Sequence, residues 1–531
     1  MGNWVKAALL EWEEFKLRLP RQALELIRGS GENELLISKP ETSMPLPIAQ
    51  ATAKNVRKKA GLALWMERVL DECVRASLDF SADAVHDLRV ALRRCRSIAD
   101  GLRVMDPDPA WKHMKQAGRQ LFRELGELRD VQVMKDWVGH LGDPNDLVTV
   151  AMLQFLDTSE GQLKQQAEVG LREFDRKQWR RWIASLPRRA ARIRAGSMVF
   201  KHLALERWTE AYELHRRALR NRSQVAFHSL RIGLKRFRYI VENFLPEQHE
   251  AWKDDLKDLQ DLLGEVHDLD VLWATVLRVN AFPDAESRSK WHVRIIEERT
   301  RRIEKYRSKM VGKTSVWQVW RAQLPAGKQI ESAALNRLKL WASFLDPDFK
   351  HSIHVTRLAL QLYDGLPAKQ TPQDSEPSDQ RSILQVAALL HDVGRSKKEK
   401  AHHKATFNLI ERVTPPLSWS KQKMHWVGIV ARYHRGTLPG VGQKTLVRLT
   451  QGQRQRILKL AGILRLANAL DSQRDGHIQR LEVRNENGFI EIAAQGYSPR
   501  ERSAESIAAA RHLLEIVYRQ PLMVKTLKAT K

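Results

Sequence analysis

The sequence predicts a mainly α-helical protein with more than one domain, and three observations predict it. The chain has 531 residues, which is too many for one ordinary hydrophobic core and enough for two or three domains. Apolar residues recur at helical spacing along almost the whole chain, whereas runs of alternating apolar and polar residues are scarce. Proline and glycine gather mostly between these segments, for example at 106–109 and 324–327.

Composition predicts a globular protein with a polyanionic partner. The chain carries 90 Lys and Arg against 63 Asp and Glu, a formal net charge of +27. Hydrophobic residues make up 43%, a normal globular fraction, so a disordered basic tail is excluded as the whole explanation. An excess of this size favours nucleic acid, an anionic membrane surface or polyphosphate as the partner.

The cysteine count and the hydropathy pattern predict a cytoplasmic protein. Cys73 and Cys95 are the two cysteines, too few for a disulfide scaffold and consistent with a reducing compartment. The apolar run at 1–20 contains acidic residues, so we expect no signal peptide. The absence of a run of 18 uncharged apolar residues predicts no membrane span.

The positions of linkers predict three parts. Residues 1–48 are expected to form a helical or loosely ordered extension, 49–325 a helical domain with halves at 49–195 and 196–325, and 335–531 a second domain. The proline-rich stretch 366–380 is interpreted as an insertion loop within that second domain. A small β-hairpin is predicted near the C-terminus, because 478–484 and 489–493 alternate around Asn-Glu-Asn-Gly.

The first domain contains an internal repeat. Residues 85–96 read VHDLRVALRRCR, and 142 residues later 227–238 read FHSLRIGLKRFR. Each copy is followed by a second match, LGELRDV at 125–131 and LGEVHDL at 263–269. Two matched segments in the same order indicate a duplicated helical domain.

The repeat places basic side chains in stripes. At about 100° per residue, positions 0, +3, +7 and +10 lie within roughly 80° of one another on a helix. The two stripes are His86, Arg89, Arg93 and Arg96, and His228, Arg231, Lys235 and Arg238, with Arg94 and Arg236 to one side. A single stripe is most simply a solvated face or a set of ion pairs. Duplication in so basic a chain favours phosphate binding, for which the guanidinium fork is suited.

These segments resemble the CHAD family, the conserved histidine α-helical domains, over about residues 50–320. The resemblance implies two four-helix halves around a basic central groove that binds inorganic polyphosphate. The implied groove residues are His86, Arg89, Arg93, Arg94, Arg96, His228, Arg231, Lys235, Arg236 and Arg238. For the two histidines, helix packing is an equal alternative. The basic segment 172–194, with Trp179 and Trp182, either extends the groove or is a solvated helix.

The C-terminal third contains an ordered series of histidines and aspartates. The series is His351, His354, His391, Asp392, His402, His403, His434 and Asp471. Any one histidine is more simply a core residue, but the ordered series around a His-Asp pair predicts a metal site. Imidazole and carboxylate ligands without thiolate suit one or two divalent ions among Mn, Mg, Fe, Ni and Zn.

This order resembles the HD superfamily of metal-dependent phosphohydrolases. The flanking words LLHDVGR, HHKATFNLIERV, IVARYHRG and LRLANALDSQR resemble the C-terminal HD domain of the exopolyphosphatase/guanosine pentaphosphate phosphatase family, over about 335–531. The implied metal ligands are His354, His391, Asp392 and Asp471, with His403 and His434 at a second metal position. The implied catalytic residues are His391, Asp392 and Lys404, and the implied phosphate contacts or ligand braces are Lys404, Arg432, Arg435 and Arg474.

Two departures from that family matter. The family often reads His-Lys-His-Ser where this chain has a histidine replaced by Ala405, so occupancy by two metals stays open. The actin-like ATPase domain of those phosphatases has no counterpart here, since its glycine-rich phosphate loops are missing. Because that domain carries polyphosphate hydrolysis in the family, exopolyphosphatase activity does not follow from the resemblance.

Two functions remain as expectations. In the first, the protein binds polyphosphate, and its HD domain hydrolyses a phosphoester or phosphoanhydride of polyphosphate or a nucleotide with a metal-activated water. In the second, the protein is a non-catalytic module that docks on polyphosphate granules and senses a nucleotide or metal. We favour the enzyme, because a degenerate hydrolase is expected to lose His391 or Asp392. Nucleic acid is a weaker partner, since no base-reading motif or stacking platform accompanies the stripes.

Overall fold

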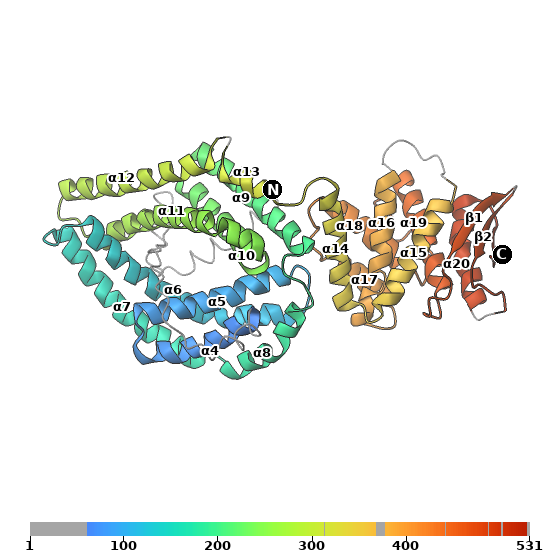
Figure 1. The fold of residues 1–531 in the computed structure, drawn as a ribbon, viewed down its shortest axis with the longest axis horizontal. Helices are drawn as coiled ribbons and strands as arrows, with labels where there is room; N and C mark the ends of the chain where they lie inside the picture. Colours follow the sequence, from blue (N-terminus) through green and yellow to red (C-terminus); the bar gives the residue numbers. More distant parts are fainter. Residues whose placement is uncertain are drawn as a thin grey trace. The chain divides into compact units, whose positions relative to one another are not determined.

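The computed structural model describes residues 61–312, 314–367, 377–440, 442–486, 488–500 and 503–527. The expected extension 1–48 and most of the expected insertion loop lie outside these residues. Within them the mainly α prediction is confirmed, since seventeen α-helices and three strands are present. The chain divides into two compact units: the first ends at Pro325, and the second begins at Ala326 and also takes in 104–107. Each unit is described by itself (Figure 1).

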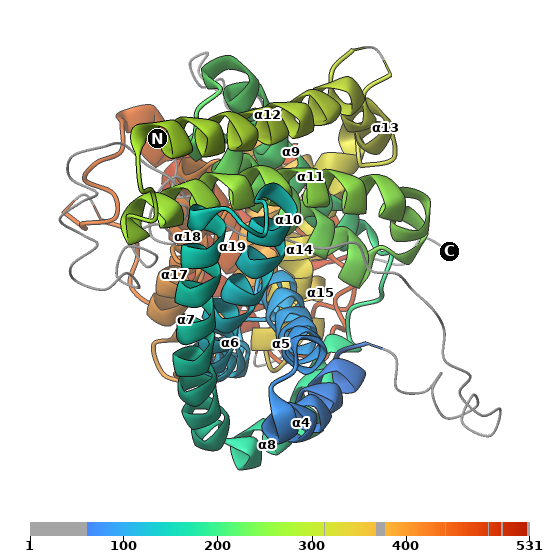
Figure 2. The same cartoon turned by 90° about the vertical axis from the view of Figure 1, so that its left-hand side faces the viewer.

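The first unit consists of two successive sets of five helices. The first set is α4 (Leu62–Asp79), α5 (Ala82–Leu102), α6 (Pro109–Leu141), α7 (Leu147–Glu173) and α8 (Arg176–Ala190). The second set is α9 (Met198–Asn221), α10 (Gln224–Phe244), α11 (Pro246–Val279), α12 (Ala285–Met310) and α13 (Val316–Ala322). In each set the stripe-bearing helix, α5 or α10, is followed by two long helices that pack together, α6 on α7 and α11 on α12 (Figure 2).

The two stripe-bearing helices begin in the same way. Ser81 precedes α5, and its hydroxyl accepts a hydrogen bond from the N–H of Ala84. Ser223 precedes α10, and its hydroxyl accepts from the N–H of Ala226. Each serine lies five residues before the histidine of its stripe. The N-cap therefore starts both helices in the same register and sets which side chains share the basic face.

A fifth helix closes each half, which the four-helix expectation did not include. Trp179 and Trp182 on α8, and Trp317 and Trp320 on α13, are all buried. The indole N–H of Trp179 donates to the carbonyl of Met66 on α4 over 2.9 Å, so α8 is fixed to the first helix of its own half. The two tryptophans of the basic segment 172–194 are therefore core residues.

The two halves meet through α5 and α10. A Cβ added at Gly101 would lie 2.3 Å from the ring of Phe244, so only glycine permits this approach of the helices. The side-chain amide of Asn243 donates to Ser97 over 2.9 Å, and Arg94 pairs with Glu242. Contacts between the halves therefore place the two basic stripes on neighbouring helices.

The second unit is a helical core with a small sheet at its C-terminal end. Its elements are α14 (Lys328–Leu345), α15 (Phe349–Gly365), α16 (Pro377–Leu390), the 3₁₀ helix η2 (Val393–Ser396), α17 (His402–Ile410), α18 (Lys421–Arg432), α19 (Gln451–Leu470), β1 (Leu481–Glu486), β2 (Phe489–Ala494), α20 (Ser503–Tyr518) and β3 (Leu522–Thr526). α19 packs against α15, α16, α18 and α20, and its buried face runs through the centre of the hydrophobic core.

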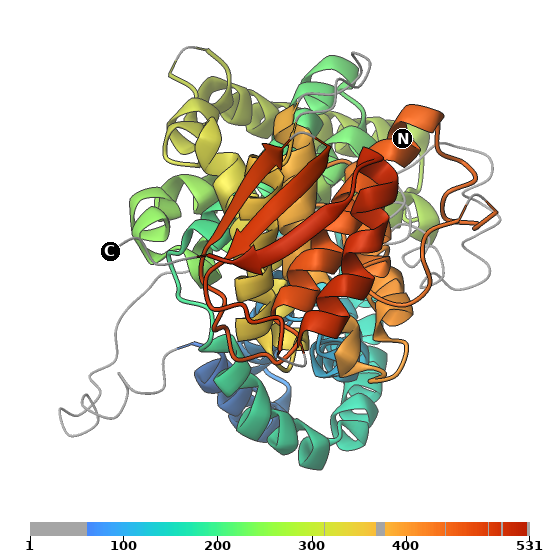
Figure 3. The same cartoon turned by 90° about the vertical axis from the view of Figure 1, so that its right-hand side faces the viewer.

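The sheet confirms the predicted hairpin and adds a strand. β1 and β2 pair antiparallel, with Leu481 opposite Ala494. β3 pairs parallel with β2 after the crossover through α20 (Figure 3). β3 was not predicted because it has only five residues and no turn joins it to its partner strand, so local sequence does not reveal it. Within the described ranges, no helix has the length and apolar character to cross a membrane.

Candidate functional site

Helix ends in the second unit bring the histidine and aspartate series together. His391 and Asp392 follow the last residue of α16, His402 is the first residue of α17, and His434 lies two residues after the end of α18. Asp471 follows α19 directly, whereas His351 lies inside α15. These side chains are all nearly fully buried, although most come from helix ends, which are usually exposed.

Asp392 lies at the centre of this group. Its Oδ1 atom is 3.1 Å from Nε2 of His402, 3.7 Å from Nε2 of His391 and 3.8 Å from Nε2 of His434. The Nε2 atoms of His402 and His434 are themselves only 3.2 Å apart. Three imidazole nitrogens therefore converge on one carboxylate oxygen.

The backbone orients all three imidazoles in the same way. In each ring, Nδ1 lies within hydrogen-bonding distance of the carbonyl three residues earlier: 2.7 Å for His391 to Ala388, 3.0 Å for His402 to Glu399 and 2.7 Å for His434 to Ala431. Because a carbonyl oxygen only accepts, each Nδ1 carries the hydrogen. In the neutral rings Nε2 is then a lone-pair donor directed at the group around Asp392.

His351 and Asp471 join the group from the other side. Nδ1 of His351 lies 2.7 Å from Oδ2 of Asp471, and the N–H of Gly476 donates to the other Asp471 oxygen over 2.9 Å. The ligand-type atoms form two clusters, His351-His391-Asp392 and Asp392-His402-His434, with spacings within 4.8 Å inside each. Asp392 belongs to both clusters.

Electrostatics keep the carboxylate at the centre of the group anionic. Burial alone would raise the pKa of Asp392, but His391, His402 and Arg474 hold that pKa well below the usual range. The guanidinium of Arg474 donates to Oδ2 of Asp392 over 2.6 Å and to Asp348 over 2.8 Å. Burial lowers the pKa of His391 and of His434 below the usual histidine value.

A close backbone contact holds His402 against Asp392. A Cβ added at Gly394 would lie 2.2 Å from the carbonyl oxygen of His402, so η2 and α17 approach as only glycine allows. The hydroxyl of Thr406 accepts from the N–H of Gly394 over 3.0 Å and donates to the carbonyl of His391 over 2.9 Å. Ala401, just before α17, has φ +63, a strained value that turns the chain into the group.

The structure selects different histidines from the sequence pattern at two positions. His351, and not His354, has its ring in the cluster; Nδ1 of His354 instead lies 2.9 Å from the guanidinium of Arg357. His402, and not His403, faces Asp392. His402 and His403 point about 100° apart on their helix, and His351 and His354 about 60° apart, so the choice depends on tertiary packing. The proposed positions His391, Asp392, His434 and Asp471 do come together.

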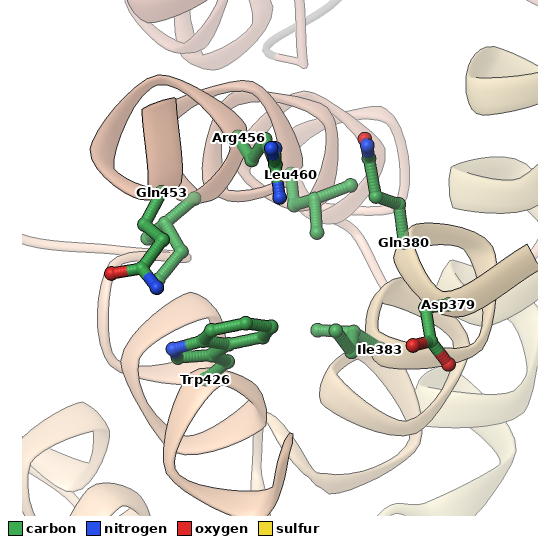
Figure 4. Close-up of a pocket in the computed structure, with 8 residues that line it drawn as sticks. Asp379, Gln380, Ile383, Trp426, Gln453, Arg456 and Leu460 are labelled. Atoms are coloured by element: carbon green, nitrogen blue, oxygen red, sulfur yellow. The ribbon is translucent and has the colours of Figure 1, made fainter. Parts of the chain in front are cut away.

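The remaining predicted residues of the second unit fall into two places. Arg474 braces Asp392, as described above. Lys404, Arg432 and Arg435 line a separate cavity together with His403. Another cavity of the unit, beside Trp426 (Figure 4), holds only about 20 Å³ and is too small for a substrate.

In the first unit, basic side chains of both stripes lie near a half-buried acid. Asp130 on α6 lies 3.8 Å from Arg89. Burial raises the pKa of Asp130 to about 6, while Arg89 from α5 and Arg231 and Lys235 from α10 act to lower it. Basic side chains of both halves therefore converge on one carboxyl group.

All ten predicted groove residues are half-buried. Burial raises the pKa of Tyr239, and Arg93, Arg238 and Arg231 oppose this rise, so positive charges from both stripes also lie near its hydroxyl. The guanidinium of Arg96 lies 4.4 Å from the ring of Phe122. Half-buried guanidinium groups packed on rings differ from a freely solvated basic face.

Several of the ten are engaged in contacts within the protein. Arg94 and Arg238 both pair with Glu242, Arg238 over 3.7 Å. The ring of His228 packs on that of His267 at 4.7 Å, and Nδ1 of His86 lies 3.4 Å from Asp87. These contacts place Arg94 at the junction of the halves and pack His228 of α10 against His267 of α11.

Comparison with known proteins assigns a family to each unit. Residues 64–277 match the model of the CHAD domain, and residues 338–494 match domain III of the Ppx/GppA phosphatases. The crystal structure of the CHAD domain from the plant Ricinus communis has 19% sequence identity and a TM-score of 0.34, covering 55% of this chain and 97% of that chain. No curated protein matches the chain. The chain thus carries a CHAD domain and a Ppx/GppA domain III.

Proposed function

We propose that this protein binds polyphosphate chains through its CHAD domain and hydrolyses a phosphorylated substrate at a metal centre in its second unit. The observation that carries the hydrolase proposal is the convergence of three Nε2 atoms on Asp392. Since each Nδ1 carries the hydrogen, the lone pairs of His402 and His434 face each other across 3.2 Å. Such an arrangement is unfavourable without a cation or a proton between them.

The donor set fits a divalent metal. Asp392, His402 and His434 would hold one ion, and His351, His391 and Asp392 would contribute to a neighbouring position, with Asp471 beside His351. Nε2 of His391 is buried and has no hydrogen-bond partner among the described residues, so its lone pair is available. A bound ion supplies the Lewis acid that activates water and neutralises the charge developing at phosphorus.

The protein's own groups hold this centre in position. Arg474 neutralises the outer oxygen of Asp392 and ties it to Asp348. Arg435, Arg465 and Arg474 also line a cavity of about 410 Å³, whose wall includes His351, His434 and Asp471. Guanidinium groups beside the cluster would orient a phosphoryl group by paired hydrogen bonds. Polyphosphate and nucleotide phosphates are the candidate substrates.

Polyphosphate binding by the first unit is supported by its CHAD match and by the paired stripes. Arg89, Arg231 and Lys235 all act on Asp130, against Glu127 as the other nearby acid, which leaves an excess of positive charge there. A flexible phosphate chain satisfies long basic side chains without a fixed base geometry.

The decisive experiment substitutes the central carboxylate. Asp392→Asn keeps the shape of the side chain but removes the charge, so we expect loss of bound Mn²⁺ and of phosphate release from polyphosphate and from guanosine nucleotides. Asp364→Asn is the matched control, because Asp364 is exposed and pairs only with Arg381 among the described residues. Phosphate release by Asp392→Asn at the wild-type rate would refute the hydrolase, whereas polyphosphate binding would remain in both variants.

A further inference from the structure

A second cavity in the second unit is lined by positive charge. Its volume is about 380 Å³, and its lining includes His403, Lys404, Arg432, Arg435 and Lys444; these five residues define the basic cavity. None of the described residues lining it is acidic. The polar groups among them are Tyr433, Thr437, Gln443 and Thr445.

The cations of the basic cavity have no acidic partner among the described residues. Lys404, Arg432, Arg435 and Lys444 make no ion pair with any residue that the structure describes. Arg381 of the same unit, by contrast, pairs with Asp364 at 2.8 Å. Four unpaired like charges around one concave surface repel one another, and an anion would relieve this cost.

Local structure holds these groups together. Lys404 lies in the first turn of α17, whose start has no side-chain cap, so the helix end adds its partial positive charge. Gly436 packs closely on His403, where an added Cβ would lie 3.2 Å from Nε2. The Tyr433 hydroxyl bonds to Gln443 and lies 2.7 Å from Thr445. The loop after α18 is thus fixed against the start of α17.

The basic cavity adjoins the cavity of the metal cluster. The consecutive residues Tyr433, His434 and Arg435 divide between them: Tyr433 lines the basic cavity, His434 the cluster cavity and Arg435 both. Arg465, which lines the cluster cavity, donates to the carbonyl of Gly436 over 2.6 Å. The guanidinium of Arg435 therefore borders both cavities, and the hydrogen bond from Arg465 holds the segment between them in place.

We propose that the basic cavity binds a second phosphoryl group of the substrate whose scissile phosphoryl group lies at the metal cluster. This inference rests on the proposed hydrolase, and it names the substrate class: compounds with two or more linked phosphoryl groups, such as a diphosphate or an oligophosphate. A simple monoester would leave Lys404, Arg432 and Lys444 without a counter-ion. Arg435, at the border, would contact the bridging region of such a substrate.

Lysine footprinting tests this site independently of the first unit. Full-length protein is treated with EDTA, so that no turnover occurs, and acetylated with and without tripolyphosphate. We expect acetylation of Lys404 and Lys444 to slow by about tenfold at saturation. Lys339 and Lys421 are controls, because both are exposed and line neither cavity; their rates stay unchanged. Arg432→Gln abolishes the protection, whereas Arg448→Gln, at an exposed arginine outside the cavity, retains it.

The outcomes separate this proposal from the hydrolase. Unchanged acetylation of Lys404 and Lys444, with Lys235 of the first unit protected, overturns the basic cavity even if phosphate is released with Mn²⁺. Equal protection by inorganic phosphate at the same concentration overturns the assignment to linked phosphoryl groups. Protection by tripolyphosphate alone supports the site, and a lack of phosphate release in that case counts against only the hydrolase.

Discussion

In the first unit the candidate binding groups are long basic side chains spread along α5 and α10, whereas in the second the candidate metal-binding groups are short side chains gathered around Asp392. The stripe residues are half-buried, and their positions are set mainly by helical period. The cluster residues are nearly fully buried, and backbone carbonyls fix three of their rings. The first arrangement suits a flexible polymer, and the second suits one fixed reacting group.

This contrast implies different sensitivity to substitution. A stripe shares its charge among many side chains, so the loss of one changes affinity gradually. The cluster depends on each ligand, because the remaining buried polar groups then lack a partner. The predictions below compare the two units on this basis, beginning with the largest expected effect.

The largest effect is expected at His402. His402→Ala removes one of three imidazoles around Asp392, and we expect metal affinity to fall by at least about a hundredfold. Metal content after gel filtration measures this. His403→Ala is the matched control for metal content, since its ring lines the basic cavity instead. If His403→Ala loses metal and His402→Ala keeps it, the assignment of ligands by the structure is wrong.

The next largest effect is expected at Gly394. Gly394→Ala places a Cβ against the backbone of His402 and Thr406, so we expect a loss of about 2 kcal/mol or more in stability of the second unit. Denaturant unfolding measures this loss. Gly139→Ala on α6 is the control, because nothing lies within 4 Å of its added Cβ; helix propensity predicts a gain of about 0.5–1 kcal/mol there. Equal stability of both variants would contradict the close backbone contact of Gly394 with His402 and Thr406.

The same contrast explains what was predictable from sequence. The stripes and the hairpin follow from local periodicity, and the structure contains the predicted helices and hairpin. The His-Asp pair was found because its neighbours form a recognisable order. The choice of His351 over His354 and of His402 over His403 depends on how α15 and α17 pack, which no local pattern encodes. The basic cavity also includes Lys444, which no local sequence pattern marks as a site residue.

A smaller effect is expected from the stripes. The double variant Arg89→Gln/Arg231→Gln removes one cation from each half beside Asp130, so we expect polyphosphate affinity to fall by about tenfold and the salt slope of binding to decrease by about two. Binding titrations at several salt concentrations measure both. Arg216→Gln/Arg220→Gln changes net charge equally at exposed positions of α9. If both double variants weaken polyphosphate binding equally, only the net charge of the protein matters for binding. The stripes would then not be a specific binding surface.

The smallest effect concerns pH and Asp130. Its pKa is raised to about 6, so it gains a proton as pH falls from 7.5 to 5, and the basic stripes then lose their central negative charge. We expect wild-type affinity for polyphosphate to rise by about fivefold over this range. Asp130→Asn is expected to bind at pH 7.5 as tightly as the wild type at pH 5, and to lose this part of the pH dependence.

The matched control for this titration is Asp254→Asn, at an exposed position of α11. It changes net charge by the same amount, so protonation of polyphosphate and of other side chains affects both variants equally. The difference between the pH profiles of Asp254→Asn and Asp130→Asn therefore gives the contribution of Asp130. Parallel profiles for wild type, Asp130→Asn and Asp254→Asn would show that Asp130 does not face the bound chain. The stripes would then bind away from the junction of α5, α6 and α10, and the groove would have to be placed elsewhere on the same helices.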